Sequence, residues 1–321
     1  MASVCLTRKD KFVRENCFDL DVTNSIGSNI VETISRCEKL YDRNIAKIAE
    51  DVISNNQHLI MLTGPSSSGK TTTAFKIQKE LEKNGVACAT VSLDCFFKNK
   101  TEIGFDAQGK PDFEKPQALE LDLVATKLNE LQTHGKAMLP VFDFLTGIRT
   151  DDVKKVDLRG GVAIIEGIHA LNPLILDHLC TNDVYKVYIS VHSGFEKQGS
   201  EVLCKRNVRF IRRLVRDYKF RGSSADNTFM LWENVVKDEV KYVLPYKVNA
   251  NIRIDTTFPY EVGMLKKDAL EILGQVEENS QYLENAVSLI KSIELFKEYD
   301  SSLLGSASLL REFCGGSEFE Y

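Results

Sequence analysis

The sequence predicts an α/β fold in which helices cover both faces of a mainly parallel sheet. Short apolar segments typical of buried strands recur along the chain, at residues 58–63, 86–93, 162–166, 184–191 and 250–254. Helical patterns lie between them, and this alternation favours parallel strands joined by crossover helices. The octet Gly-Pro-Ser-Ser-Ser-Gly-Lys-Thr at residues 64–71 also follows the first of these segments directly. Together these observations predict the three layers, helix, sheet and helix, of a P-loop nucleotide-binding fold.

The remaining elements are predicted in chain order from their apolar spacing. A helical pattern from Ile30 to Ile48 indicates an N-terminal helical extension over residues 1–45. A second helix is expected from Gln117 to Thr133. After Pro259, apolar residues keep helical spacing to Phe296, so we expect a helical C-terminal extension over 261–321. Residues 46–260 would then form the nucleotide-binding domain.

The octet at 64–71 reads Gly-Pro-Ser-Ser-Ser-Gly-Lys-Thr and fits the phosphate-binding loop pattern at every fixed position. A strand-like run precedes it and a helix-compatible stretch follows it, as that motif requires. Backbone N–H groups of such a loop and the start of the next helix bind phosphate. The predicted nucleotide-binding residues are Gly64, Ser66, Ser67, Ser68, Gly69, Lys70, Thr71 and Thr72. Lys70 can reach the terminal phosphates, and the Thr71 hydroxyl can bind Mg²⁺.

Two carboxylates end predicted strands. Asp94 follows the strand at 86–93, and Glu166 ends the strand at 162–166 and is followed by Gly167. Ligands of parallel sheets bind at the carboxyl ends of the strands. Asp94 is therefore a candidate general base or metal ligand, and Glu166 a candidate Mg²⁺ ligand at the Walker B position. Helix capping is the alternative role for either residue.

Residues 205–221 contain eight basic residues and a single acid, Asp217. Apolar residues recur there at helical spacing, and Arg209, Arg212 and Arg216 follow the same rhythm on a neighbouring face. We therefore expect a helix with one apolar and one cationic side. Beside a phosphate-binding loop, such a helix favours a lid, placed at about 200–225, that closes over a transferring phosphoryl group. A solvated charged face and an RNA-binding surface are the alternatives.

Composition limits the class of protein. The 321 residues are 43% hydrophobic and 27% charged, with a net charge of −5. We therefore expect a globular protein that binds neither nucleic acid nor membranes. The charged N-terminus and the eight scattered cysteines, none in a Cys-x-x-Cys pair, favour a cytoplasmic protein with reduced thiols.

From about Ile48 to Val262 the chain resembles the uridine kinase and phosphoribulokinase family of P-loop kinases, most closely the bacterial uridine-kinase-like nucleoside kinases. The resemblance rests on several motifs: the octet at 64–71, Ser92-Leu93-Asp94, Pro140-Val141-Phe142-Asp143-Phe144 with Arg149, Ile165-Glu166-Gly167-Ile168-His169, and Arg212-Arg213-Leu214-Val215-Arg216-Asp217 with Arg221-Gly222.

This resemblance implies transfer of the γ-phosphate of ATP to the 5′-hydroxyl of a pyrimidine nucleoside, with Mg²⁺ and in a homo-oligomer. The implied catalytic residues are Asp94 as base, Lys70, and the lid residues Arg212, Arg213 and Arg216. The implied metal ligands are Thr71, Asp94 and Glu166. The implied acceptor-binding residues are Phe113, Glu114, Phe142, Asp143, Phe144, Arg149, Arg213 and Arg221.

The chain departs from uridine kinases where the acceptor is selected. Those kinases usually have Asp in place of Glu114, Tyr in place of Phe142 and a base-reading His in place of Gly147. A site that lacks hydrogen-bonding groups discriminates less between acceptors. Three classes therefore remain open: a kinase of the uridine-kinase type, a P-loop kinase for another hydroxyl acceptor such as a pentose phosphate, vitamin precursor or polyol, and a non-catalytic nucleotide-binding regulator.

Overall fold

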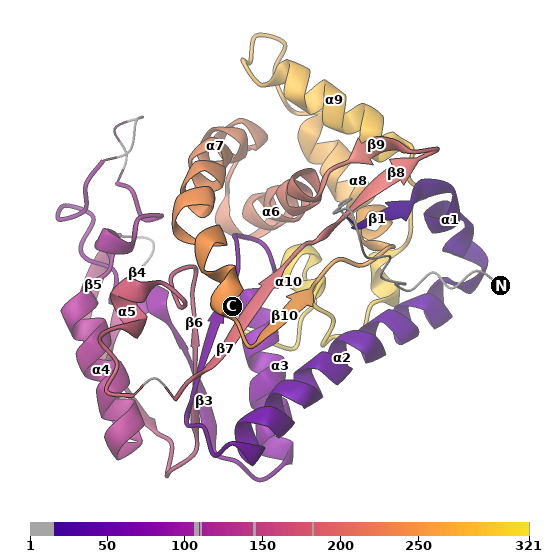
Figure 1. Cartoon of the computed structure of the whole chain (residues 1–321). Helices are drawn as coiled ribbons and strands as arrows, with labels where there is room; N and C mark the ends of the chain where they lie inside the picture. The colour runs from indigo at the N-terminus through magenta and orange to yellow at the C-terminus, as the bar shows by residue number, and fades with distance from the viewer. Residues whose placement is uncertain (1–15, 106–108, 110, 144–145, 182, 321) are drawn as a thin grey trace. The chain divides into compact units, whose positions relative to one another are not determined.

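The computed structural model describes residues 16–105, 109, 111–143, 146–181 and 183–320 (Figure 1). They form two compact units. The phosphate-loop unit comprises residues 41–190 and 231–254, and the arginine-helix unit comprises the described residues up to 40 together with 191–230 and 255–320. Both helices that cross a boundary, α2 (Ile30–Ser54) and α7 (Ala225–Tyr242), contribute to both units. The predicted functional domain boundaries at residues 45 and 260 stay a prediction.

A five-stranded sheet lies at the centre of the phosphate-loop unit. Its strands, in spatial order, are β10 (Ile252–Asp255), β7 (Tyr185–Ser190), β2 (Leu59–Thr63), β6 (Val162–Glu166) and β3 (Cys88–Ser92). Strands β3, β6, β2 and β7 pair in parallel, and every residue of β2 and β6 is buried. The predicted α/β fold and all five of its strands are confirmed, because continuous apolar runs of this length suit strands covered on both faces.

Helices cover both faces of this sheet. Helix α4 (Leu121–His134) shares a core with one face, in which Met61, Ile165 and Leu128 are buried. Helix α3 (Lys70–Lys83) contacts β2, β3 and β6 and lies on the other side of the sheet in Figure 1. The unit also holds an antiparallel hairpin and short helices: β4 (Lys136–Asp143), β5 (Ile148–Asp157), α5 (Pro173–Leu176), η2 (Leu93–Phe96), η3 (Pro116–Ala118) and η4 (Leu244–Asn249).

The predicted start of the helix at Gln117 is wrong by four residues. Pro116 begins a 3₁₀ turn, and the extended backbone of Leu119 (φ −83°, ψ 147°) ends it before α4 starts at Leu121. Apolar spacing does not reveal such an interruption, because it depends on backbone angles rather than on side-chain pattern.

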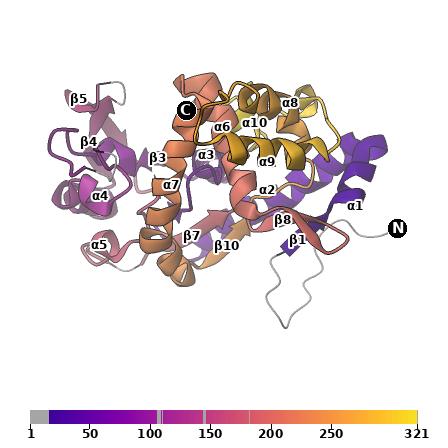
Figure 2. The ribbon, with the colours of Figure 1, turned by 90° about the horizontal axis from the view of Figure 1, so that it is seen from above.

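The arginine-helix unit is built around helices and a small sheet (Figure 2). Strand β8 (Ser193–Lys197) pairs in parallel with β1 (Asn16–Asp19) and antiparallel with β9 (Ser200–Leu203). The helices are α1 (Leu20–Ser25), η1 (Ile26–Asn29), the start of α2, α6 (Lys205–Arg221), the start of α7, α8 (Glu261–Leu273), α9 (Leu283–Glu294), η5 (Ser301–Leu303) and α10 (Arg311–Cys314). The helices predicted at 205–221 and after Pro259 are confirmed, whereas the sequence analysis missed the small sheet.

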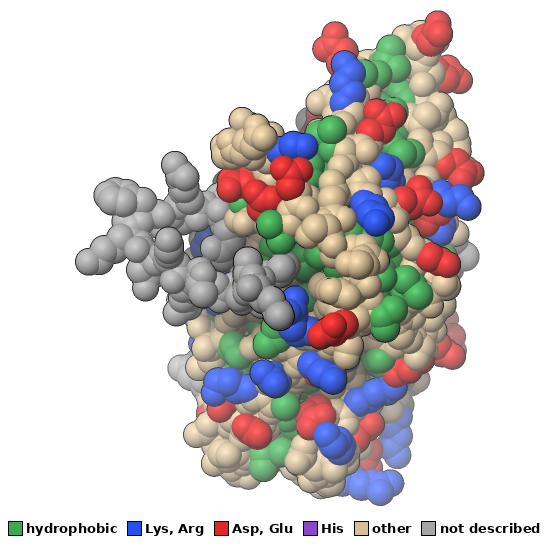
Figure 3. Space-filling model, turned by 90° about the vertical axis from the view of Figure 1, so that its right-hand side faces the viewer, with side chains coloured by type: hydrophobic (Ala, Val, Ile, Leu, Met, Phe, Trp, Pro, Cys, Tyr) green, Lys and Arg blue, Asp and Glu red, His purple; other side chains and the backbone are tan. Residues whose placement is uncertain are grey.

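The surface carries charges of both signs. On the face drawn in Figure 3, Lys and Arg side chains are interspersed with Asp and Glu, and hydrophobic side chains form small separate groups. Among the described residues, no helix has the length and apolar character needed to cross a membrane.

Candidate active site

The phosphate-binding loop connects β2 to α3 and depends on both of its motif glycines. A Cβ atom on Gly64 would lie 2.2 Å from the Ile189 carbonyl oxygen, so a side chain there clashes with the backbone of β7. Gly69 caps α3 with a φ of 90°, in the left-handed region that glycine adopts without strain. The pattern read from the sequence therefore corresponds to two separate steric requirements.

Side chains hold the first turn of α3 in place. The Thr73 hydroxyl donates to the Gly69 carbonyl at 2.6 Å, and its oxygen lies 2.6 Å from the Tyr41 hydroxyl. Lys70 Nζ donates to the Pro65 carbonyl at 3.2 Å, across the loop. All predicted nucleotide-binding residues thus lie in one continuous segment, the loop and the turn that follows it.

The loop fits a phosphate group. The Ser68 side chain is fully buried, and its hydroxyl has no hydrogen-bond partner among the described residues. A buried hydroxyl without a partner is costly, and a phosphate oxygen would accept its hydrogen bond. The neighbouring helix start adds backbone N–H groups and a partial positive charge.

The two predicted carboxylates lie at the same edge of the sheet. Glu166, the last residue of β6, pairs with Leu62 of β2 and with Ser92 of β3. Strand β2 continues into the phosphate-binding loop, and β3 continues into η2, which contains Asp94. Ser92 caps η2 by accepting a hydrogen bond from the Asp94 N–H at 3.4 Å. The buried Glu166 therefore lies between two strand ends. One is the end of β2, which leads into the loop, and the other is the end of β3, which leads to Asp94.

The charges of both carboxylates affect the pKa of the Cys95 thiol. Burial, followed by the negative charges of Asp94 and Glu166, raises the pKa of the Cys95 thiol to about 12. The thiol therefore stays protonated near neutral pH.

An aromatic cluster lies beside η2. The ring centroids of Phe97 and Phe113 are 5.0 Å apart, those of Phe97 and Phe142 are 5.7 Å apart, and those of Phe113 and Phe142 are 6.1 Å apart. The structure therefore brings together the predicted acceptor residues Phe113 and Phe142. Phe97, three residues after Asp94, was not among the residues predicted from the sequence. The predicted acceptor residue Phe144 lies outside the described residues.

Arg149 braces this cluster from β5. It pairs in register with Phe142, and its Nη2 atom donates to the carbonyls of Phe97 at 3.0 Å and Phe96 at 3.4 Å. Its Nη1 atom lies 3.8 Å from the Glu120 carboxylate. The guanidinium thus holds η2 against the β4–β5 hairpin.

The hairpin turn explains one departure from the uridine kinase pattern. Asp143 accepts from the Thr146 hydroxyl at 2.8 Å, and its carbonyl accepts from the Gly147 N–H at 2.8 Å. Gly147 has a φ of 70°, and a Cβ there would lie 3.0 Å from the Lys100 side chain. A histidine at this position would be strained.

Glu114 is joined to the Glu166 turn through its backbone. Its carbonyl lies 3.0 Å from His169 Nε2, and its N–H donates to Asp112 Oδ1 at 3.2 Å. Burial lowers the pKa of His169 to about 4, so the ring is neutral near pH 7. His169 was not among the predicted site residues, because a histidine after a strand carries no sequence signal for its partner.

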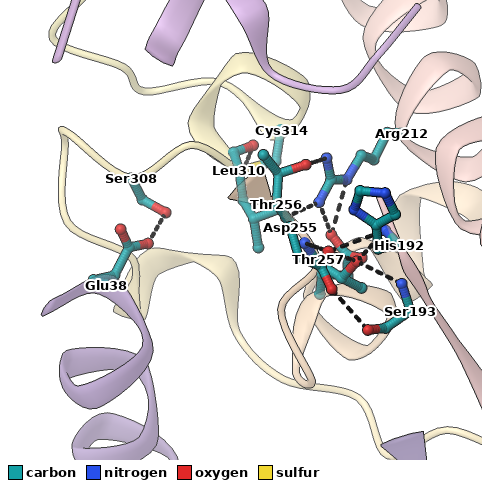
Figure 4. A network of polar contacts seen from close by, with 11 residues as sticks. Glu38, His192, Ser193, Arg212, Asp255, Thr256, Thr257, Ser308, Leu310 and Cys314 are labelled. Carbon is teal, nitrogen blue, oxygen red and sulfur yellow. Dashed lines mark hydrogen bonds and ion pairs between the residues drawn. The ribbon is translucent and has the colours of Figure 1, made fainter. Parts of the chain in front are cut away.

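In the arginine-helix unit, Arg212 is fully buried. Its guanidinium lies beside Thr256 (Figure 4). Its Nε atom donates to Glu261 at 2.8 Å, its Nη2 atom also contacts Glu261, and Nη2 donates to the Thr256 carbonyl at 2.6 Å. Burial raises the pKa of Glu261 to about 7 against the attraction of Arg212. These contacts tie α6 to the start of α8, and the predicted catalytic role of Arg212 stays a prediction.

Three further arginines of α6 converge on one carboxylate. Asp217 lies 3.1 Å from Arg213 Nε, 2.8 Å from Arg216 Nη2 and 3.6 Å from Arg221 Nη1. Helix α6 has the expected apolar and cationic sides, but its cationic side is not fully solvated, because Arg209, Arg212 and Arg213 are buried together with its apolar residues. Counter-ions from Asp217 and Glu261 allow the burial of Arg213 and Arg212.

The chain is similar in sequence to a known family of kinases. The model of the phosphoribulokinase / uridine kinase family fits residues 59–190 and 199–260. The uridine kinase of Staphylococcus haemolyticus (strain JCSC1435) is 30% identical over 200 residues, which are 62% of this chain and 87% of that protein. The uridine kinase of Staphylococcus aureus (strain JH9) is 32% identical over 201 residues, 61% of this chain and 86% of that protein.

Among solved structures, phosphoribulokinase from Rhodobacter spheroides aligns with a TM-score of 0.42 and 18% identity, over 64% of this chain and 74% of that one. The family match extends over the phosphate-binding loop, both strand-end carboxylates, the β4–β5 hairpin and α6. The chain therefore belongs to the phosphoribulokinase / uridine kinase family and is a kinase.

Proposed function

We propose that this kinase transfers the γ-phosphate of ATP to a hydroxyl group of a small acceptor, and that the acceptor is the 5′-hydroxyl of a pyrimidine nucleoside. The observation that carries the proposal is the pairing of Glu166 with both Leu62 and Ser92, which gathers the loop, Glu166 and Asp94 at one edge of the sheet. The relatives named uridine kinase support a nucleoside acceptor.

Each residue has a role set by its chemistry. The loop N–H groups and the Ser68 hydroxyl bind the phosphates, and Lys70 neutralises their charge. Asp94 accepts the proton of the acceptor hydroxyl while the hydroxyl oxygen bonds to the γ-phosphorus and ADP leaves. The Thr71 hydroxyl and the carboxylates of Glu166 and Asp94 would supply the oxygen ligands that Mg²⁺ prefers, and Mg²⁺ held there would neutralise charge on the phosphates.

A second candidate is a kinase for another hydroxyl acceptor, such as a pentose phosphate, a vitamin precursor or a polyol. It is favoured by the acceptor segment, where Phe97, Phe113 and Phe142 form an apolar cluster and the φ of Gly147 disfavours a base-reading histidine. Glu114 also extends one methylene further than the aspartate of uridine kinases. Both candidates require Asp94 and differ only in the acceptor.

The test is ATP consumption by the purified full chain with Mg²⁺, measured against uridine, cytidine, other nucleosides, pentose phosphates and polyols. Turnover with a pyrimidine nucleoside supports the first candidate, and turnover confined to another class supports the second. ATP binding without turnover on any acceptor would contradict both and leave a nucleotide-binding regulator.

The matched variants are Asp94→Asn, which removes the base, and Asp122→Asn, which removes an exposed carboxylate at the start of α4. We expect kcat to fall by about 10²–10⁴-fold in the first variant because a general base contributes that much. The second variant should match the wild-type chain. Equal activity of both variants would show that Asp94 is not the base.

A further inference from the structure

His169 is a buried histidine whose two ring nitrogens differ in their surroundings. The side chain is 1% exposed, and Nε2 lies 3.0 Å from the Glu114 carbonyl oxygen. A carbonyl only accepts hydrogen bonds, so Nε2 carries the proton and Nδ1 is the unprotonated acceptor. Nδ1 is also buried and has no hydrogen-bond partner among the described residues. The ring therefore has one directed donor and one buried acceptor.

The turn before His169 is fixed to the strand that carries the phosphate-binding loop. The Gly167 N–H donates to the Leu62 carbonyl at 3.1 Å, and the Thr63 hydroxyl donates to the Ile168 carbonyl at 2.7 Å. Leu62 and Thr63 are the last two residues of β2 before the loop. The backbone from Glu166 to His169 is therefore tied to the donor side of the site.

The other end of the hydrogen bond lies in the acceptor segment. Glu114 follows Phe113, whose ring packs against Phe97 and Phe142. The Glu114 N–H is itself held by Asp112 Oδ1 at 3.2 Å, so both backbone groups of Glu114 have partners. A shift of the His169 ring would thus be transmitted to the segment that contacts the acceptor.

We propose that His169 is a positioning residue, which sets the distance between the acceptor-binding segment around Glu114 and the phosphate-binding loop by donating from Nε2 to the Glu114 carbonyl. This inference rests on the proposed kinase reaction at the same site. In-line phosphoryl transfer requires the attacking oxygen close to the γ-phosphorus, and a misplacement of about 1 Å costs about 10²-fold in rate.

The groups around the ring keep it neutral. Burial is the main cause of the lowered pKa of His169, the positive charge of Lys70 lowers it further, and the hydrogen bond to Glu114 opposes both. The Tyr242 ring packs edge-on at 6.2 Å between centroids. A neutral ring keeps its Nε2 proton for Glu114 throughout the neutral pH range, which suits a permanent link.

The experiment compares three variants with the wild-type chain. His169→Phe removes both nitrogens at similar ring size, whereas His169→Gln places an amide N–H₂ group near the position of Nε2. His58→Phe is the matched control, because His58 Nδ1 lies 3.1 Å from the Gly161 carbonyl oxygen. His58 directly precedes β2, and Gly161 directly precedes β6. It removes a similar histidine–carbonyl contact at the opposite ends of those strands.

For His169→Phe, with each variant assayed below its melting temperature, we expect kcat/KM for the acceptor to fall about 10- to 100-fold and the KM for ATP to stay within about twofold. His169→Gln should restore the acceptor kcat/KM to within about threefold of wild type, and His58→Phe should leave it unchanged. Equal losses in the Phe and Gln variants, or an equal rise in the KM for ATP, would overturn the proposal.

Nitrogen-15 NMR of the histidine rings gives a test that does not depend on turnover. We expect His169 to be in the Nε2–H tautomer and to keep it down to about pH 5. Observation of the Nδ1–H tautomer would overturn the proposal. If the wild-type chain phosphorylates no acceptor, the proposed function fails, whereas this measurement still decides whether the link between His169 and Glu114 exists.

Discussion

At the scale of single residues, Gly64 and Asp94 depend on the structure in different ways. Gly64 is required because the Ile189 carbonyl occupies the space that a side chain would need. Asp94 is proposed as the base for its chemistry, and the structure contributes its place next to the end of β3. Both were predicted from the sequence, because a short motif encodes local geometry and local chemistry together.

We expect Gly64→Ala to weaken ATP binding. The added methyl group has to displace the backbone of β7 or distort the loop, and overpacking of this kind costs about 1–3 kcal/mol, equivalent to about 5- to 150-fold in affinity. Isothermal titration calorimetry with a non-hydrolysable ATP analogue measures the effect. The control is Gly305→Ala, where a Cβ meets no atom within 4 Å; unchanged affinity in both variants would contradict this account of the loop.

The contacts of Phe97 and His169 and the reason for a glycine at 147 could not be predicted from the sequence. Phe97 and His169 lie next to predicted site residues, but their partners, Phe142 and the Glu114 carbonyl, are distant in the chain. The absence of a histidine at 147 was visible in the sequence. Its cause, the positive φ of the hairpin turn, was not.

At the scale of elements, the arginines of helix α6 form two separate sets of ion pairs. Arg212 anchors the helix to Glu261 at the start of α8, while Arg213, Arg216 and Arg221 surround Asp217. The helix was predicted from apolar spacing, and its limits coincide with those of the basic segment at 205–221. The division of its arginines between an anchor and a cluster required the packing of α8 and the segment before it.

We expect Asp217→Asn to lower kcat about 10-fold or more with little change in the KM for ATP, because the arginines predicted to act on the transferring phosphoryl group would lose their shared counter-ion. Steady-state kinetics below the melting temperature measure this effect. The control, Asp268→Asn, removes the 2.5 Å partner of Lys219 on the same helix and should have little effect on kcat. The same kcat in both variants would show that the Asp217 cluster has only a structural role.

We expect Arg212→Met to destabilise the chain by about 3–5 kcal/mol, because it leaves Glu261 buried without its partner. The loss should be smaller at pH 5 than at pH 8, since a buried carboxyl without a counter-ion binds a proton. Urea denaturation at both pH values measures it. In the control, Arg212→Met/Glu261→Met, both charges are removed and the dependence on pH should disappear; a pH-independent loss in the single variant would contradict the prediction.

The sign of this effect in the wild-type chain follows from the raised pKa of Glu261. Below about pH 7 the Glu261 carboxyl of the folded state binds a proton, whereas in the unfolded state it does so only below about pH 4.5; it is the charged partner of Arg212 above about pH 7. The contribution of Glu261 to stability is therefore complete below about pH 4.5 and is lost as the pH rises to about 7.

At the scale of the whole molecule, two compact units share the chain, and each is assembled from segments distant in sequence. The arginine-helix unit joins the described N-terminal residues, α6 and the C-terminal helices. Its core includes Phe313, which is fully buried, with its ring 5.2 Å from Arg212 Cζ. The last helix of the chain is therefore part of the surroundings of α6.

We expect Phe313→Ala to destabilise the arginine-helix unit by about 3–5 kcal/mol, the usual cost of removing a buried phenylalanine ring. Hydrogen–deuterium exchange should accelerate in peptides from residues 191–230 and 255–320 and stay unchanged in 59–166. The control is Leu295→Ala, whose side chain is 50% exposed. Acceleration over the whole chain would show that the two units unfold as one.

The sequence by itself determined the fold class, the positions of the five strands of the main sheet, the phosphate-binding loop and the two strand-end carboxylates. Each of these is encoded locally: apolar runs favour buried strands, and glycines permit the loop. Kinase chemistry could be predicted for the same reason, because its motifs are short segments placed at the carboxyl ends of parallel strands.

Only the tertiary structure decided which distant residues meet. Strand register placed Glu166 between the ends of β2 and β3, and packing brought Phe97, Phe113 and Phe142 together. It also buried Arg212 against Glu261 and set His169 against the Glu114 carbonyl. The physical reason is that these contacts join segments tens of residues apart, and their partners are selected by the packing of the whole core rather than by any local pattern.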